Sequence, residues 1–255
     1  MLARQRHEAI LELIQREGSV RVSELVRHLG VSDATIRHDL EVLSGNGLLA
    51  KVYGGATRLH ADEPGFAANA RKSRREKDAI GARAARFIEP GAAVAVSAGT
   101  TTWAAARHLI AVPGLTVVTN SIPVAQVFHR AAGPNQTVIL TGGVRTPSDA
   151  LVGSVAVQAI IKLHFDVVLM GVHGMTERTG FTTPNLLEAE TNRAMVAAGR
   201  RLIVLADHSK WGAIGISTIA HLRDADVLIS DAGLEAGARE ALQAEVGDLI
   251  IVSSG

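Results

Sequence analysis

The sequence of 255 residues contains no cysteine, and this absence excludes several kinds of site at once. Without a thiol, the chain can form no disulfide, no zinc site with cysteine ligands and no thiolate nucleophile. The ten histidines are scattered, and none shows HExxH or another metal-ligand spacing. We therefore expect no metal site and no cofactor, and the composition fits a reducing compartment.

Long apolar runs are also missing. No stretch approaches the roughly 20 apolar residues that a membrane-spanning helix needs. The first ten residues, MLARQRHEAI, are charged from the start and contain no apolar stretch of signal-peptide length. Hydrophobic residues make up 47% of the chain, which argues against general disorder. We expect a folded cytoplasmic protein with no membrane partner.

Familiar catalytic signatures are absent from the sequence. It has no GxGxxG dinucleotide loop, no GxxxxGK[ST] phosphate loop and no GxSxG nucleophile elbow. Glu188 and Glu190 lie two residues apart on a predicted helix, so they do not share a face. Charge decides little, because 26 Lys and Arg residues stand against 25 Asp and Glu residues. A balanced total is compatible with basic residues gathered on one surface. We expect no enzymatic activity.

The first 57 residues show the apolar periodicity of three helices. Gly30 breaks the chain between the second and third helix, and Ser32 can cap the third because its hydroxyl accepts from the unpaired amides of the first turn. A connection of about three residues forces a sharp crossing, which is typical of a helix-turn-helix. The predicted buried stripes are Ile10, Leu13 and Ile14, then Val22, Leu25, Val26 and Leu29, then Ile36, Leu40 and Leu43.

A hairpin follows the third helix, because apolar residues flank Gly54 and Gly55, which permit a tight turn. Three helices and a hairpin predict a winged helix. With its apolar stripe inward, the third helix presents a polar face, on which Arg37 can donate two hydrogen bonds to a guanine edge. An ordinary solvated face is the alternative. The residues expected to contact DNA are Ser32, Thr35, Arg37 and His38 on the helix, and Lys51 and Tyr53 on the wing.

Strands and helices alternate over residues 75–255. Apolar, mostly β-branched runs of strand type occupy 92–96, 116–119, 137–140, 167–170, 202–205, 227–229 and 249–252. Helical patterns occupy 77–88, 102–109, 155–163, 184–198 and 234–245. This alternation predicts a mainly parallel sheet with helices on both faces. The expected fold is an N-terminal all-α winged helix-turn-helix over 1–57, a linker over 58–74 and a C-terminal α/β domain over 75–255.

Loops that follow the predicted strands are rich in groups that hold anions and hydroxyls, such as SAGTTTW, TNS, TGGVR and ADHSKW. The carboxyl ends of parallel strands share one edge of a sheet, where ligands bind. We expect a phosphorylated sugar or polyol there, with Lys210 beside the phosphate and Asp207 accepting from hydroxyls. For His173 a structural role is an equal alternative. The candidate residues are Gly99, Thr100, Thr101, Thr102, Asn120, Ser121, Gly142, Gly143, Arg145, His173, Asp207 and Lys210.

Six stretches in this order resemble the DeoR family of bacterial transcriptional regulators: VSDATIRHDLEVLSGNGLLAKVYGGA, GTTT, VVTNS, LTGG, GFTTPNLLEAETNRAM and LADHSKWG. The resemblance covers nearly the whole chain. It implies a winged helix-turn-helix, a sensor domain related in fold to ribose-5-phosphate isomerase, repression of carbohydrate-use genes that a phosphorylated sugar relieves, and assembly into dimers or tetramers.

The resemblance also places individual residues. The family's DNA-reading Arg-Arg-Asp run falls on Arg37, His38 and Asp39, so His38 replaces the second arginine. Ser97 stands where the family often carries an aspartate, and we count it among the effector residues. We therefore expect a DNA-binding regulator whose partners are double-stranded operator DNA, a phosphorylated sugar and further copies of the chain.

Two other functions make different predictions. A sugar-phosphate isomerase with an accessory N-terminal domain needs an acid or base within reach of a carbon-bound proton. The stretch LMGVHGMTERTG lacks the aspartate-rich loop that a resemblance to isomerases would imply. A scaffold that uses its winged helix for protein contacts predicts neither DNA binding nor stabilisation by a ligand.

Overall fold

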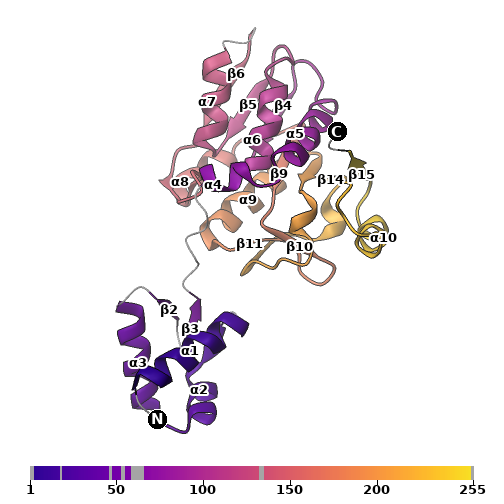
Figure 1. Ribbon diagram of the computed structural model, residues 1–255. Coiled ribbons are helices and arrows are strands. Elements are labelled where there is room, and N and C mark those ends of the chain that lie inside the picture. Colours follow the sequence, from indigo (N-terminus) through magenta and orange to yellow (C-terminus); the bar gives the residue numbers. More distant parts are fainter. Residues whose placement is uncertain are drawn as a thin grey trace. The chain divides into compact units, whose positions relative to one another are not determined.

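The computed structural model describes residues 3–17, 19–45, 48–52, 55–58, 66–131 and 135–253. The chain divides into two compact units, residues Met1–Pro64 and Gly65–Gly255 (Figure 1). Each unit has a hydrophobic core of its own. Within the described ranges, no helix combines the length and the apolar character that crossing a membrane requires.

The N-terminal unit contains three helices and a small antiparallel sheet, with the strand order β1-β3-β2. The predicted apolar stripes form its core, since Ile10, Leu25, Ile36 and Leu40 are almost fully buried. A strand over 19–21 was not predicted, and it adds a third member to the expected hairpin. The elements are α1 (Ala3–Glu17), β1 (Ser19–Arg21), α2 (Val22–Leu29), α3 (Asp33–Gly45), β2 (Leu49–Val52) and β3 (Gly55–Arg58).

The turn between α2 and α3 has the predicted chemistry. Gly30 adopts a left-handed conformation with φ of 65°, and its amide donates to the Val26 carbonyl at 3.0 Å. This closes α2 in the manner of a glycine C-cap. The Ser32 hydroxyl then accepts from the Thr35 amide at 3.2 Å, as a helix N-cap does. The predicted short, capped turn between the second and third helix is therefore confirmed.

The C-terminal unit is built on a seven-stranded sheet in which every neighbouring pair is parallel. The prediction of a mainly parallel sheet is confirmed, and each predicted strand is present with its bounds shifted by at most two residues. In order across the sheet, the strands are β15 (Leu249–Val252), β14 (Val227–Asp231), β12 (Leu202–Leu205), β9 (Val167–Gly171), β4 (Ala93–Val96), β5 (Thr116–Thr119) and β6 (Thr137–Leu140).

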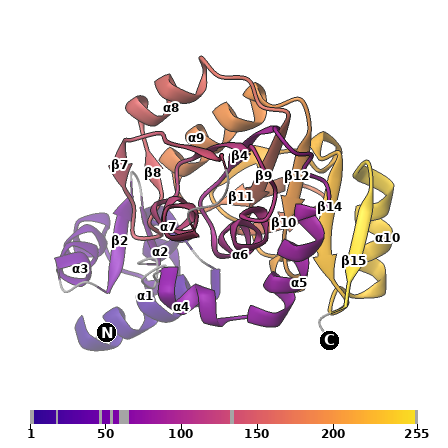
Figure 2. The ribbon, with the colours of Figure 1, turned by 90° about the horizontal axis from the view of Figure 1, so that it is seen from above.

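Helices cover both faces of this sheet (Figure 2). Val94 and Val96 of β4 pack with one set of helices, whereas Ala95 packs with the other, as the alternation of side chains along a strand requires. The first set is α5 (Arg74–Ala85), α6 (Thr100–Leu109) and α7 (Ile122–Ala131). The second set is α8 (Ser154–Ile160), α9 (Leu186–Ala198) and α10 (Ala236–Glu245).

Several elements differ from the sequence expectations. Helix α7 was not predicted, because Pro123 falls inside it and disguises its first turn. Helix α9 begins at Leu186 and not at Pro184, since the Asn185 side chain caps it by accepting from two amides. A second antiparallel sheet, which was not predicted, joins β10 (Gly174–Thr176), β11 (Gly180–Thr183) and β13 (Ser217–Ala220).

The stretch 58–74, expected to be a linker, contains a further helix, α4 (Phe66–Arg71). Phe66 lies edge-on to the Trp103 ring of α6, with ring centroids 5.7 Å apart. This contact gives α4 a place on the C-terminal unit. Phe66 is the one large apolar side chain of this six-residue helix, so the helix produces no apolar stripe in the sequence.

Candidate nucleic-acid interface and effector site

Helix α3 presents its predicted polar face to solvent within the N-terminal unit. Arg37 and His38 are exposed, while Thr35 is half-buried and hydrogen-bonds to the exposed Ser32. In the free protein, the Arg37 guanidinium pairs with Asp33 one turn earlier. Both partners are more than half exposed, so the pair is weak and solvent-screened. A stronger acceptor, such as a guanine edge or a phosphate, can therefore replace Asp33 at little cost.

Two predicted wing residues can be placed only in part. Lys51 lies on β2, where its backbone pairs with Ala56 of β3, and nothing is described of its side chain. Tyr53 lies outside the described residues. Their contacts with DNA stay predictions.

Asp39 faces the interior and not the DNA-reading face. Its carboxylate accepts from Arg6 and lies 3.0 Å from the Nε2 atom of His7, so both partners come from α1. Burial raises the pKa of Asp39, but hydrogen bonds from Arg6 and His7 outweigh burial and lower it overall. The third residue of the Arg37–Asp39 run thus fixes α3 against α1, a role that the resemblance did not imply.

In the C-terminal unit, the loops after β4, β9 and β12 come from three adjacent strands, so the parallel sheet brings them to one edge. Gly99 begins α6, and the backbone amides of Thr100, Thr101 and Thr102 have no hydrogen-bond partner in the described structure. The Thr102 hydroxyl donates to the Gly99 carbonyl and is fully buried. The first turn of α6 therefore has unpaired amides of the kind that bind an anion.

Two of the predicted residues bind other loops. Asn120 is buried; its Oδ1 atom accepts from the Ala98 amide at 2.9 Å, and its amide group donates to the Leu151 carbonyl. The buried Ser97 hydroxyl accepts from the Gly171 amide at 2.9 Å. These contacts hold the loop after β4 to its neighbours. Both buried side chains therefore hold the loops at this edge of the sheet in place.

Asp207 and Lys210 follow β12 in a short helical turn. The Asp207 Oδ1 atom accepts from the Ser209 amide and hydroxyl, whereas the buried Oδ2 atom has no hydrogen-bond partner in the described structure. The Nζ atom of Lys77 lies 3.9 Å from Oδ2. Lys77 comes from α5 and was missed in the sequence, because a single lysine in a helix is ordinarily solvated.

The remaining predicted residues differ in their burial and in their hydrogen-bond partners. Ser121 is buried, and its hydroxyl accepts from the Val124 amide at the start of α7. Arg145 is exposed and pairs with Asp149. His173 is exposed on the turn after β9.

The two glycines after β6 have positive φ, which glycine adopts without strain. At Gly143, an added Cβ would also lie 2.5 Å from the Val152 carbonyl oxygen. Strand β7 (Val144–Arg145) therefore requires glycine before it in order to approach β8 (Leu151–Val152). These glycines have a structural reason to be where they are.

Glu188, in the first turn of α9, was considered in the sequence only as a possible pair with Glu190. Its carboxylate accepts from the hydroxyls of Thr146, Ser148 and Thr183. The loop between β7 and β8 is thereby held to α9.

At the end of β14, the Asp231 carboxylate accepts from the backbone amide of His208 at 2.7 Å and lies 2.8 Å from the Nδ1 atom of the same histidine.

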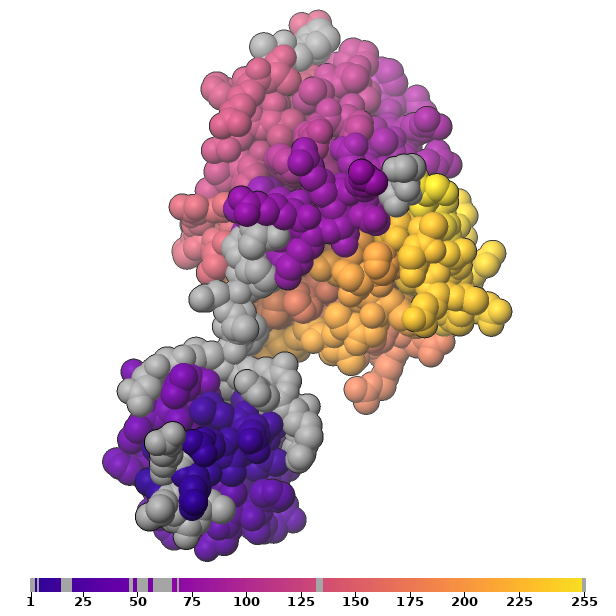
Figure 3. Space-filling model, viewed as in Figure 1, coloured from indigo at the N-terminus to yellow at the C-terminus, as the bar shows by residue number. Residues whose placement is uncertain are grey.

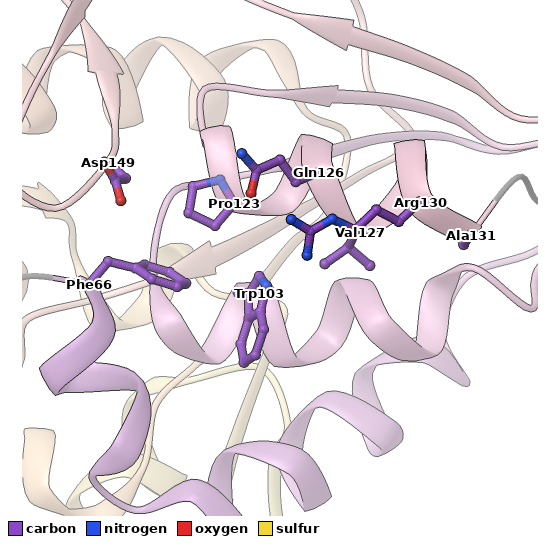
Figure 4. Close-up of a pocket in the computed structure, with 8 residues that line it drawn as sticks. All are labelled: Phe66, Trp103, Pro123, Gln126, Val127, Arg130, Ala131 and Asp149. Carbon is purple, nitrogen blue, oxygen red and sulfur yellow. The ribbon is translucent and has the colours of Figure 1, made fainter.

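A groove of about 460 Å³ lies on the surface between α6 and α7, with α4 forming one wall (Figure 4). None of the predicted effector residues lines it. Its lining residues are Phe66, Trp103, Pro123, Gln126, Val127, Arg130, Ala131 and Asp149. Among the described residues, no cluster of three or more histidine and carboxylate side chains could hold a metal ion.

Comparison with known proteins gives matches over both units. The family model for the DeoR-like helix-turn-helix domain matches residues 6–62, and the model for the DeoR C terminal sensor domain matches residues 72–232. The HTH-type transcriptional regulator GolR of Listeria innocua is 35% identical over 89% of this chain and 90% of that protein.

Other relatives are similar over comparable lengths. The transcriptional repressor AccR of Agrobacterium fabrum is 32% identical over 89% of each chain. The glycerol-3-phosphate regulon repressor of Escherichia coli is 29% identical over 89% of this chain and 90% of that protein. Among solved structures, ribose 5 phosphate isomerase A from Neisseria gonorrhoeae superposes with a TM-score of 0.39 at 14% identity, over 54% of this chain and 53% of that one.

The buried Asp39 generates a prediction about pH. A carboxyl whose pKa is lower in the folded state contributes stability that is present above its unfolded pKa, about 3.9, and lost as the pH falls through the folded value. We expect Asp39→Asn to destabilise the N-terminal unit by about 1–3 kcal/mol at neutral pH. In the variant, the loss of stability that protonation of Asp39 causes below about pH 4 should be absent.

Amide hydrogen exchange of α1 and α3 peptides in the full chain, measured from pH 7 downward, checks this prediction. Asp33→Asn removes an exposed carboxylate from the same helix and serves as the matched control. Equal protection of both variants at neutral pH would contradict a structural role for Asp39.

Proposed function

The chain belongs to the DeoR family of transcriptional regulators, and we propose that it is a repressor whose binding to operator DNA is controlled by a phosphorylated sugar or polyol. The relatives are named as transcriptional regulators, which supports this function over an isomerase. One observation carries the proposal: a single chain joins a solvent-facing reading helix to a sheet edge that is equipped for an anion and hydroxyls.

We assign base reading to α3. Its buried stripe, together with Asp39, fixes the helix to its own unit, so that Arg37 and His38 stay on the outer face. Arg37 suits a guanine edge, and the Ser32 and Thr35 hydroxyls suit phosphates near the helix N-terminus. His38 offers a shorter side chain than the arginine of the family pattern. We therefore expect a base contact of different specificity at this position.

We assign the effector to the edge between β4 and β12. One strand, β9, separates these two, so their ends lie about 10 Å apart at the usual strand spacing. This distance suits a small sugar phosphate whose phosphate meets the amides of Thr100 to Thr102 and whose hydroxyls meet Asp207. Lys210 adds a positive charge at the same edge. Ser97 and Asn120 support the loops that carry these groups.

We assign self-association to the edge strand β6 and the residues beside it, which belong to the C-terminal unit drawn in space-filling form in Figure 3. Val138, Ile139 and Leu140 are all exposed, and β6 bears no charged side chain. Val144 and Val155 are exposed as well, and a Cβ built on Gly142, two residues beyond β6, would lie 3.5 Å from the Val155 side chain.

A second copy fits this patch for two reasons. A two-fold axis places like residues opposite one another, which an uncharged surface tolerates. An edge strand also offers unpaired backbone groups to another strand. Two reading helices, one from each copy, would match a palindromic operator.

Arg37→Ala tests the reading helix. We expect specific binding to the intergenic DNA beside the gene to weaken by about 1–3 kcal/mol, because a bidentate base contact is lost. Fluorescence anisotropy against a scrambled duplex of the same length separates specific from non-specific binding. Arg200→Ala, an exposed arginine of the C-terminal unit, is the control. Unchanged discrimination between the two duplexes would refute the assignment.

Asp207→Asn and Lys210→Ala test the effector edge. A ligand at 100 times its dissociation constant stabilises the folded chain by about 2.7 kcal/mol, which a thermal-shift panel of sugar phosphates detects. We expect both variants to lose the shift that the wild-type chain shows, whereas Lys162→Ala, an exposed lysine elsewhere, keeps it. A full shift in both variants would place the ligand elsewhere.

Val144→Glu tests the self-association surface. Val144 is 67% exposed in the single chain, so the charge should not disturb folding but should repel its counterpart across a two-fold axis. We expect sedimentation velocity to show a monomer. Ile216→Glu, at a residue that is 71% exposed outside the patch, should leave the oligomer intact. The same oligomer in both variants would exclude this surface.

A further inference from the structure

Lys77 is a buried cation with a structural task at the end of α4. It lies in the first turn of α5 and is 5% exposed. Its Nζ atom donates to the carbonyl oxygens of Asn69 and Lys72, both at 2.8 Å. The last carbonyls of a helix have no partner within the helix. Lys77 therefore completes the C-terminal end of α4 and the turn that follows it.

The same ammonium group faces the incompletely bonded carboxylate of Asp207. The distance of 3.9 Å from Nζ to Oδ2 is too long for a hydrogen bond, and Oδ2 has no other partner in the described structure. A buried carboxylate oxygen without a donor is costly. A ligand hydroxyl that donates to Oδ2 would relieve this cost. The carboxylate is therefore prepared for a group that the free chain does not supply.

The charges around Lys77 favour an added anion. Burial lowers the pKa of Lys77; Asp207 raises it, while Lys210 and Lys72 lower it further. Two further lysines, Lys210 and Lys72, thus lie near enough to Lys77 to repel its ammonium group, with Asp207 and Glu76 as the nearby acids. An anionic oxygen bonded to the ammonium would compensate for its burial. Hydrogen bonds between two charged groups are also stronger than those to neutral carbonyls.

We propose that Lys77 is a binding residue of the effector site, and that its ammonium group leaves the Asn69 and Lys72 carbonyls for an anionic oxygen of the bound effector, so that occupancy releases α4. This inference rests on the proposed function, because it requires an anionic effector at the edge that holds Asp207. The ligand class is a phosphorylated sugar or polyol with a hydroxyl that can reach Asp207.

Release of α4 has a consequence for the chain that precedes it. Helix α4 has six residues, too few to be stable without contacts. Once Lys77 leaves, the Phe66 contact with Trp103 is the aromatic anchor that remains. Residues 59–65 connect α4 to β3 of the DNA-binding unit. Binding of the effector at the sheet edge thereby changes α4, which lies next to the segment that joins the two units.

Lys77→Met and Lys162→Met are the matched variants, because both remove one ammonium group but only Lys77 is buried. Calorimetric titrations of the full chain use ribose 5-phosphate, glucose 6-phosphate, fructose 1-phosphate, glycerol 3-phosphate and inorganic phosphate as probes. For each probe that binds the wild-type chain, Lys77→Met should weaken binding roughly tenfold or more, because a hydrogen bond to a charged group is lost. Lys162→Met should retain the wild-type affinity.

Amide hydrogen exchange of the wild-type chain provides the second measurement and decides alone if Lys77→Met does not fold. Peptides covering 66–73 should exchange faster when the ligand is bound, whereas peptides of β12 should not. Unchanged affinity in Lys77→Met, or unchanged exchange of α4 with bound ligand, would overturn this inference and leave the proposed function intact. A wild-type chain that binds none of the probes would overturn both.

Discussion

Parallel strand direction is the constraint on which the C-terminal unit depends. Each of the seven strands ends at the same edge, so the sheet itself brings polar loops that are far apart in the sequence to that edge. The same direction makes helices begin at this edge, and their unpaired amides point toward it. Ser97, Asn120 and Glu188 then hold neighbouring loops together with partly buried hydrogen bonds. The edge is thereby shaped before a ligand arrives.

In the N-terminal unit, buried contacts likewise hold a functional element in place. A reading helix must keep one face free, so its other face has to supply all of its attachment. Ile36, Leu40 and Leu43 provide the apolar part of that attachment. Asp39 adds a directional part, because its carboxylate is bonded to two residues of α1. Held in this way, α3 can present Arg37 and His38, the proposed DNA contacts, with little loss of conformational freedom.

Much of this could be predicted from local patterns. Apolar periodicity located α2 and α3, and short β-branched runs located all seven parallel strands, because burial on one face or on two leaves a direct mark on the sequence. Helix α7 was not predicted, because Pro123 and a short apolar turn resemble a loop. The structural role of Asn120 was not predicted for a different reason. Its partners, Ala98 and Leu151, are 22 and 31 residues away, and no local pattern reports such a distance.

Lys77 and Asp39 show where such prediction ends. A charged residue in a helix is ordinarily solvated, and only its distant partners make burial tolerable. Those partners, Asp207 for Lys77 and Arg6 for Asp39, are brought near by tertiary structure alone. Both residues link separate elements of the structure. Asp39 joins α3 to α1, and Lys77 lies between α4 and the proposed effector edge.

Thermodynamic coupling between operator and effector tests the central claim most directly. The dissociation constant of the operator is measured with and without a saturating sugar phosphate, and that of the sugar phosphate with and without operator. A repressor controlled by this ligand predicts two equal coupling factors, on the order of 5- to 150-fold, because linkage between two sites is reciprocal. A sugar phosphate that binds the chain yet leaves operator affinity unchanged would contradict it.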